Sequence, residues 1–167
     1  AAILVTHDQS EAITLSERVL LMKNGKLIQS CTPVEIYRYP KTLWASSFVG
    51  EVNHIPTFWK GNSLNSPLGR INVPIDIGKN TRVLMVRPED FNIKSETDGN
   101  FNGIIKTVEF SGPKQTIVVE LKNGESVRVS ESPHFLLSPN DPVKITAKRF
   151  LCFNCLGEKI DGFPLEI

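Results

Sequence analysis

The sequence predicts a mixed fold, in which a short α/β segment (residues 1–50) is followed by an all-β barrel domain (residues 51–167). Two observations predict it. Helix caps and a short apolar run typical of a parallel strand occur before residue 50, and short alternating runs separated by turn residues follow it. The chain has 167 residues, of which 40% are hydrophobic and 22% charged, as in globular proteins.

The first eight residues combine an apolar run with a histidine. Ile3 to Val5 are typical of the end of a buried parallel strand, and Asp8 with Glu11 predicts a capping box for the next helix. His7 would then lie at the carboxyl tip of a strand, where α/β sheets bind ligands. A strand-end histidine bonded to nearby backbone is the simpler interpretation of His7 taken alone. Because the strand needs neighbours, we expect the chain to be the back part of a larger protein.

The remaining residues up to 50 carry strong local signals. Asn24-Gly25 predicts a two-residue hairpin turn. Thr32 and Glu35 predict a second capping box, with Pro33 at the first helical position. The predicted elements are a helix over 9–16 with Ala12 and Leu15 facing inward, strands over 18–23 and 26–30, and helices over 33–39 and 42–49, the last ending at Gly50.

Residues 51–167 contain few helix signals and many short apolar runs. Asn123-Gly124 predicts another hairpin. The spacing of the runs is typical of a small closed or half-closed barrel. The predicted strands lie within residues 71–77, 82–86, 103–110, 116–121, 126–129 and 143–153.

Two groups of residues carry a family resemblance. The first group is Val5 to Gln9, Glu11-Ala12, Arg18-Val19, Met22, Asn24 to Leu27, Thr32-Pro33, Glu35 to Tyr37, Pro40 and Phe48 to Gly50. It resembles the end of an ABC transporter ATP-binding subunit. The second group, Val86 to Asp90, resembles the RPE segment of the C-terminal regulatory domain of bacterial importers, an oligonucleotide-binding-type barrel called the TOBE domain.

The resemblance implies a role for His7 and a nucleotide for the full-length parent protein. In the family this histidine contacts the γ-phosphate of ATP, and ATP with Mg²⁺ would be the parent's cofactors. The chain contains no G-x-x-x-x-G-K-[ST] loop, no Ser-Gly-Gly signature and no apolar run ending in Asp-Glu. Phosphoryl transfer requires those parts together, so we expect this chain alone neither to bind ATP tightly nor to hydrolyse it.

The resemblance also implies partners and a location. We expect a homodimer through the barrel, contact with the importer's membrane permease subunits, and a cytoplasmic protein peripheral to the inner face of the cell membrane. Such importers carry maltose, polyamines, sulfate, molybdate or ferric iron, and the general resemblance favours ferric iron. A net charge of +1 gives no case for nucleic-acid binding.

An alternative from another class is a free-standing barrel that binds a small anion or dimerises, with residues 1–50 as an arm. An arm should pack on the barrel, whereas a segment of a larger ATPase should expose apolar faces. Trp44 and Phe48 are expected to pack against the barrel or against the ATPase core.

Two further groups leave alternatives open. Arg87 and Glu89 either pair and position a loop within the barrel or at a subunit interface, or form a turn with a surface ion pair. Cys152 and Cys155 are interpreted as buried, inert cysteines rather than as ligands of a metal. A regulatory disulfide between them is the alternative if their strand ends early.

Overall fold

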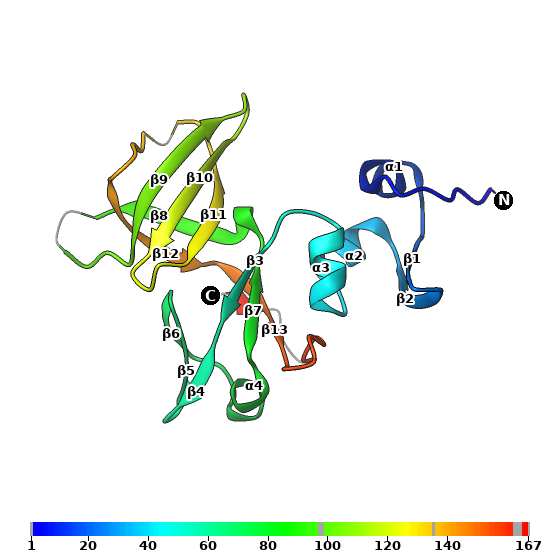
Figure 1. Cartoon of the computed structure of the whole chain (residues 1–167), viewed down its shortest axis with the longest axis horizontal. Helices are drawn as coiled ribbons and strands as arrows, with labels where there is room; N and C mark the ends of the chain where they lie inside the picture. The colour runs from blue at the N-terminus through cyan, green and yellow to red at the C-terminus, as the bar shows by residue number, and fades with distance from the viewer. Residues whose placement is uncertain (1, 97–98, 135, 162–164, 167) are drawn as a thin grey trace.

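The computed structural model describes residues 2–96, 99–134, 136–161 and 165–166. Figure 1 shows a small lobe built from the first part of the chain and a larger β-rich lobe beside it. Among the described residues, no helix is long and apolar enough to cross a membrane.

The small lobe contains three short helices and one hairpin. The Asn24-Gly25 turn has φ values of +50° and +73°, as a type I′ turn requires. The Thr32–Glu35 capping box is present, with Pro33 in the first turn. Both local predictions are therefore confirmed. The elements are α1 (Gln9–Leu15), β1 (Val19–Lys23), β2 (Lys26–Cys31), α2 (Pro33–Arg38) and α3 (Leu43–Phe48).

The amino-terminal segment differs from the prediction. Ile3 and Val5 are 92% and 91% exposed and belong to no strand, because no described strand lies beside them to pair with. Asp8 caps α1 as predicted. The Glu11 carboxylate accepts a hydrogen bond from the Thr6 hydroxyl at 2.7 Å instead of completing the capping box. Leu15, predicted to face inward, is 71% exposed.

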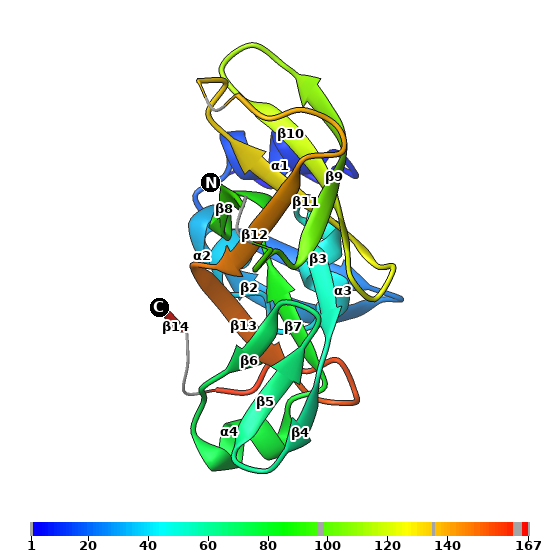
Figure 2. The same cartoon turned by 90° about the vertical axis from the view of Figure 1, so that its left-hand side faces the viewer.

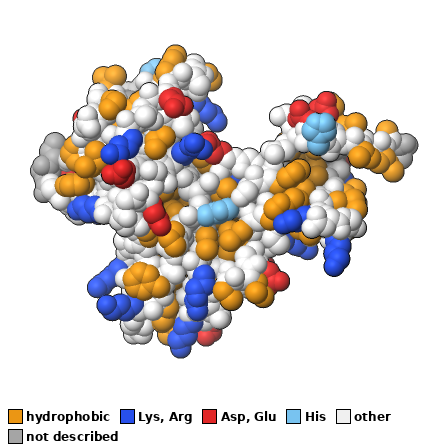
Figure 3. Space-filling view, viewed as in Figure 1, with side chains coloured by type: hydrophobic (Ala, Val, Ile, Leu, Met, Phe, Trp, Pro, Cys, Tyr) orange, Lys and Arg blue, Asp and Glu red, His pale blue; other side chains and the backbone are white. Residues whose placement is uncertain are grey.

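The small lobe has its own apolar cluster. Leu21, Ile36 and Ala45 are buried together in it with Cys31 and Val49. The rings of Trp44 and Phe48 are stacked with centroids 5.2 Å apart, and both pack against this cluster rather than against the β-rich lobe. Figure 3 shows hydrophobic side chains gathered on the surface of this lobe. On β1 and β2 the exposed hydrophobic side chains are Leu20, Met22 and Leu27.

The described strands of the β-rich lobe form three sheets, and Figure 2 shows this lobe from the side. The strand orders are β11-β10-β9-β12-β8, β14-β13-β7-β3 and β4-β5-β6. The elements are β3 (Asn53–Pro56), β4 (Phe58–Lys60), β5 (Ser63–Ser66), β6 (Gly69–Ile71), α4 (Ile75–Asn80), β7 (Val83–Val86), the 3₁₀ helix η1 (Pro88–Asp90), β8 (Phe91–Ser95), β9 (Gly103–Phe110), β10 (Gln115–Leu121), β11 (Ser126–Glu131), β12 (Pro142–Ala147), β13 (Arg149–Phe153) and β14 (Leu165–Glu166).

One hydrophobic core joins these sheets. Ile117 on β10, Ile145 on β12 and Leu84 on β7 are fully buried in the same cluster. The five-stranded sheet is open, since its edge strands β8 and β11 are not hydrogen-bonded to each other within the described residues. The sequence predicts a closed or a half-closed barrel, and the half-closed form therefore describes the structure better. Trp59 packs partly buried against this core.

Two predicted strands are wrong in extent. The run 71–77 alternates, but Pro74 cannot donate to a strand ladder, and it precedes α4 instead. The run 143–153 is two strands: β12 pairs with β8 and β9, whereas β13 pairs with β7. The chain leaves one sheet for the other at Lys148, whose N–H donates to the Asp90 carbonyl at 2.7 Å.

The cysteine prediction is correct for one residue of the pair. Cys152 is buried on β13, whereas Cys155 is exposed in the turn that follows, and both thiols are free. The described residues contain no group of His, Cys, Asp and Glu arranged to hold a metal ion.

Candidate functional site

His7 lies on the exposed bend just before α1. The helix start behind it is well formed, because the Asp8 carboxylate accepts hydrogen bonds from the backbone N–H groups of Ser10 and Glu11 at 2.7 and 3.1 Å. Among the described residues, no hydrogen bond or ion pair joins His7 to the β-rich lobe. Its predicted strand is absent, so its proposed contact with a nucleotide remains a prediction.

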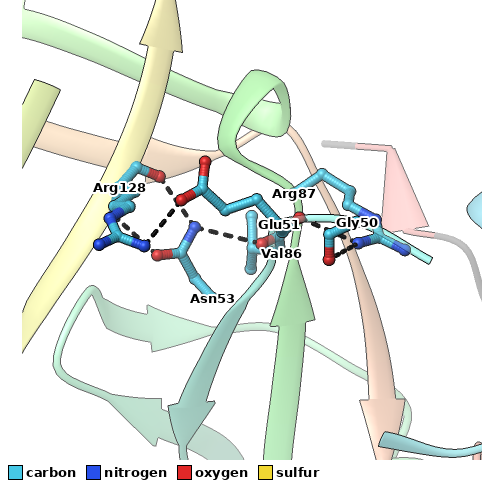
Figure 4. A network of polar contacts seen from close by, with 6 residues as sticks. All are labelled: Gly50, Glu51, Asn53, Val86, Arg87 and Arg128. Atoms are coloured by element: carbon cyan, nitrogen blue, oxygen red, sulfur yellow. Dashed lines mark hydrogen bonds and ion pairs between the residues drawn. The ribbon is translucent and has the colours of Figure 1, made fainter. Parts of the chain in front are cut away.

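The two lobes meet around Arg87, which follows β7 directly and precedes η1. Its side chain is 1% exposed, and Figure 4 shows it turned towards Gly50 at the connection between the lobes. Nη1 donates to the carbonyls of Ser46, Gly50 and Glu51 at 3.0, 3.1 and 2.9 Å, and Nη2 to that of Tyr37 at 3.1 Å. One guanidinium thus satisfies carbonyls near the ends of two helices and in the connecting segment.

The predicted pairing of Arg87 with Glu89 is not observed. Arg87 forms no ion pair within the described part of the chain, and the Glu89 carboxylate instead accepts a hydrogen bond from the Tyr37 hydroxyl at 2.7 Å. The Tyr37 ring covers the guanidinium, with 4.2 Å between the ring centroid and the Arg87 Cζ. Both members of the predicted pair therefore hold α2 of the small lobe, each through Tyr37.

A second set of contacts fixes the start of β3 and the connecting segment to β11. The Asn53 amide donates to the carbonyls of Val86 and Arg128 at 3.3 and 2.8 Å, and it accepts from the Arg128 N–H at 2.7 Å. The Arg128 guanidinium pairs with Glu51 at 2.7 Å, as Figure 4 shows. The Asn53 side chain is buried, so its contacts matter more for stability than this exposed ion pair.

A cavity of about 450 Å³ opens beside this junction. Its walls come from both lobes: Val34 and Tyr37 on α2, Arg87 and Asp90 after β7, and Arg149 on β13. Arg149 also donates to the Arg38 carbonyl at 2.9 Å. The junction is therefore a partly hollow seam between α2 and the β-rich lobe, lined by both apolar and charged side chains.

Arg87 could be singled out from the sequence, but its hydrogen-bond partners could not. The sequence signal was available in the apolar strand Val83 to Val86, because a cation directly behind a buried strand must find acceptors. The acceptors are backbone carbonyls, which carry no residue-type signature. Tyr37 was singled out only as part of the family resemblance.

Burial and the hydrogen bond to Glu89 raise the pKa of Tyr37 to about 12. The chain has two tyrosines, so in a Tyr39→Phe variant tyrosinate absorbance reports Tyr37 alone. We expect one transition near pH 12 in buffer and one near pH 10 in denaturant. Because the folded-state pKa is the higher one, the stabilisation is complete below about pH 10 and is lost as pH rises towards 12. A transition near pH 10 without denaturant would contradict the half-buried position of Tyr37 and its hydrogen bond to Glu89.

Part of the β-rich lobe matches a known domain family. The family described as "TOBE domain" matches residues 84–152, which run from β7 to β13 and include Arg87. The predicted presence of a TOBE domain is confirmed for residues 84–152, which lie within the predicted range 51–167. This domain contains the whole five-stranded sheet as well as β13.

Curated relatives extend the similarity beyond the TOBE domain. The chain is 40% identical over 126 residues to the spermidine/putrescine import ATP-binding protein PotA of Spiroplasma citri, which covers 72% of this chain and 36% of that protein. It is 36% identical over 143 residues to PotA of Salmonella typhi and 34% identical over 146 residues to PotA of Escherichia coli K12. Each of these two alignments covers 77% of this chain and 38% of the relative.

These similarities confirm the predicted resemblance to the C-terminal, TOBE-containing part of an ABC importer ATP-binding subunit. The chain spans 36–38% of the length of these relatives. Their names give no support to the preference for ferric iron. A structure of the cytoplasmic molybdate-binding protein ModG with molybdate bound is similar over 58% of this chain and 89% of its own, with a TM-score of 0.43 and 11% identity. A likeness this remote supports no inference about ligands.

Proposed function

We propose that this chain acts as the C-terminal regulatory part of the ATP-binding subunit of an ABC importer for polyamines. The observation that carries the proposal is the 34–40% identity to three spermidine/putrescine import subunits over 72–77% of the chain. In this role His7 senses the γ-phosphate of ATP, with Mg²⁺ bound elsewhere in the parent subunit. The β-rich lobe brings two such subunits together at the membrane permease, on the cytoplasmic side.

The geometry of the junction supports a regulatory role. Arg87 ties the connecting segment, α2 and α3 to the TOBE domain through four backbone carbonyls. A displacement of the TOBE domain would therefore pull on α2 and α3. The small lobe, which carries His7, would in this way respond to the position of the TOBE domain.

The free-standing module is the second candidate, and the lobe surfaces weigh against it. Residues 33–50 pack on the β-rich lobe, as an arm would. Ile3, Val5 and Leu20, however, expose apolar side chains, as a segment of a larger ATPase domain would. Exposure of this extent is costly for a module that works alone, so we favour the importer subunit.

A chimaera tests the proposal. The matching C-terminal part of Escherichia coli K12 PotA is replaced by this chain, and uptake of labelled spermidine is measured in cells that lack their own copy. We expect uptake to be restored, and a subunit that ends before the exchanged part to fail. A chimaera that carries the Salmonella typhi part establishes that the junction tolerates exchange. If that control transports and the chimaera with this chain accumulates but does not, the proposal is wrong.

A further inference from the structure

The cavity at the junction has the features of a binding site for a small molecule. Its volume of about 450 Å³ suits a ligand of modest size. Both lobes form its walls, and it is lined by the apolar side chains of Val34, Met85 and Leu151 and by the charged side chains of Arg87, Glu89 and Asp90. The lining thus includes residues of α2 and of the TOBE domain.

Arg87 is an incompletely satisfied cation in the wall of this cavity. It is 1% exposed, yet it has no ion-pair partner within the described ranges of the chain. Its Nε is buried without a hydrogen-bond partner, although Nη1 and Nη2 are used. Burial lowers the pKa of Arg87. Buried charges are ordinarily paired and hydrogen-bonded, so the Nε–H is a donor to which an anionic group of a ligand can bind.

The other walls restrict which anion fits. The charged residues that line the cavity are Arg38, Arg87, Arg149, Glu89 and Asp90. These three cations and two anions give the wall a net charge of +1, which matches a ligand with one negative charge better than one with several. Val34, Met85 and Leu151 would remove an apolar ligand body from water. A carboxylate matches a guanidinium better than a spherical anion does, because its two oxygens face the planar N–H groups. The chemistry therefore favours one carboxylate on an aliphatic body.

We propose that this cavity binds a small aliphatic monocarboxylate, with the carboxylate at the guanidinium of Arg87 and the hydrocarbon against Val34, Met85 and Leu151. The ligand adds contacts between α2 and the TOBE domain and thereby stabilises the junction between the lobes. This inference does not depend on the proposed transport function, because it concerns the chain as it stands.

The test uses hexanoate as the probe and the complete 167-residue chain. Isothermal titration calorimetry at neutral pH measures binding, and thermal unfolding measures stabilisation. We expect hexanoate to bind and to raise the melting temperature. Hexylammonium, of the same length and opposite charge, should do neither, and inorganic phosphate should bind at least about tenfold more weakly. Equal effects of hexanoate and hexylammonium, or no binding of hexanoate at millimolar concentration, would overturn the proposal.

Two variants locate the site. Val34 is 62% exposed, so Val34→Glu should leave the fold intact while it places a negative charge on the wall and weakens hexanoate binding at least about tenfold. Asp90→Asn removes a negative charge from the wall and should tighten binding several-fold. Leu20→Glu is the matched control, because Leu20 is 61% exposed and lies on β1, outside the cavity lining. Unchanged binding in folded Val34→Glu would also overturn the proposal.

Discussion

Replacing Arg87 by methionine should lower the free energy of unfolding by about 3–5 kcal/mol. Methionine retains most of the side chain's apolar volume but donates no hydrogen bond, so four carbonyls lose their donor. Each buried acceptor without a partner costs roughly 1–3 kcal/mol. Water can reach some of these carbonyls once the guanidinium is gone, which keeps the total below the simple sum. Urea unfolding of the complete chain measures the loss.

Two companion variants separate this effect from the loss of a positive charge. Arg70→Met removes an exposed arginine on β6 and should change stability by less than about 0.5 kcal/mol. Arg87→Lys retains the charge but cannot reach the same carbonyls with a planar group, so its stability should fall between the other two. Equal stability of Arg87→Met and Arg70→Met would show that the junction does not depend on the guanidinium.

Elements with a complete local signal could be predicted from the sequence. The Asn24-Gly25 hairpin and the Thr32-Pro33 helix start depend on backbone preferences of adjacent residues, and both form as expected. The β9 strand over residues 103–110 is confirmed to the residue, because its run is bounded by turns on both sides. In these places the local sequence and the tertiary fold favour the same structure.

The errors lie where a long-range choice decided the outcome. The run 143–153 is uniformly strand-like, and only its exchange of partners at Lys148 divides it between two sheets. Residues 3–5 have strand propensity but no described partner to pair with. Strand propensity depends strongly on such context, so residue type alone could not predict either case.

The candidate site shows the same division. The sequence singled out Arg87 and Glu89, but their short separation favoured a mutual ion pair. In the structure both side chains contact Tyr37 instead, and Tyr37 lies fifty residues before Arg87 in the chain. Contacts to backbone carbonyls leave no pattern in residue types, and they could not be predicted from one sequence.

His7→Ala in the PotA chimaera should reduce ATP hydrolysis by about 100-fold or more, if His7 has the proposed γ-phosphate role. The expected size is that of losing one hydrogen-bond donor aimed at charge that develops in the transition state. Because the role is in the transition state, kcat should fall more than the affinity for ATP. Steady-state hydrolysis by the purified complex gives both quantities. His7→Gln, which retains an N–H donor, should recover part of the activity.

The matched control is His134→Ala, since His134 is also an exposed histidine but lies in the β-rich lobe. It should hydrolyse ATP at the unaltered rate. Asp8→Ala addresses the alternative that His7 matters only through the start of α1. Loss of that cap should cost about 1 kcal/mol of stability without a comparable fall in kcat. If His7→Ala hydrolyses ATP as fast as His134→Ala, the histidine is a structural residue of an exposed bend. The regulatory proposal would then depend on the TOBE domain and its Arg87 junction alone.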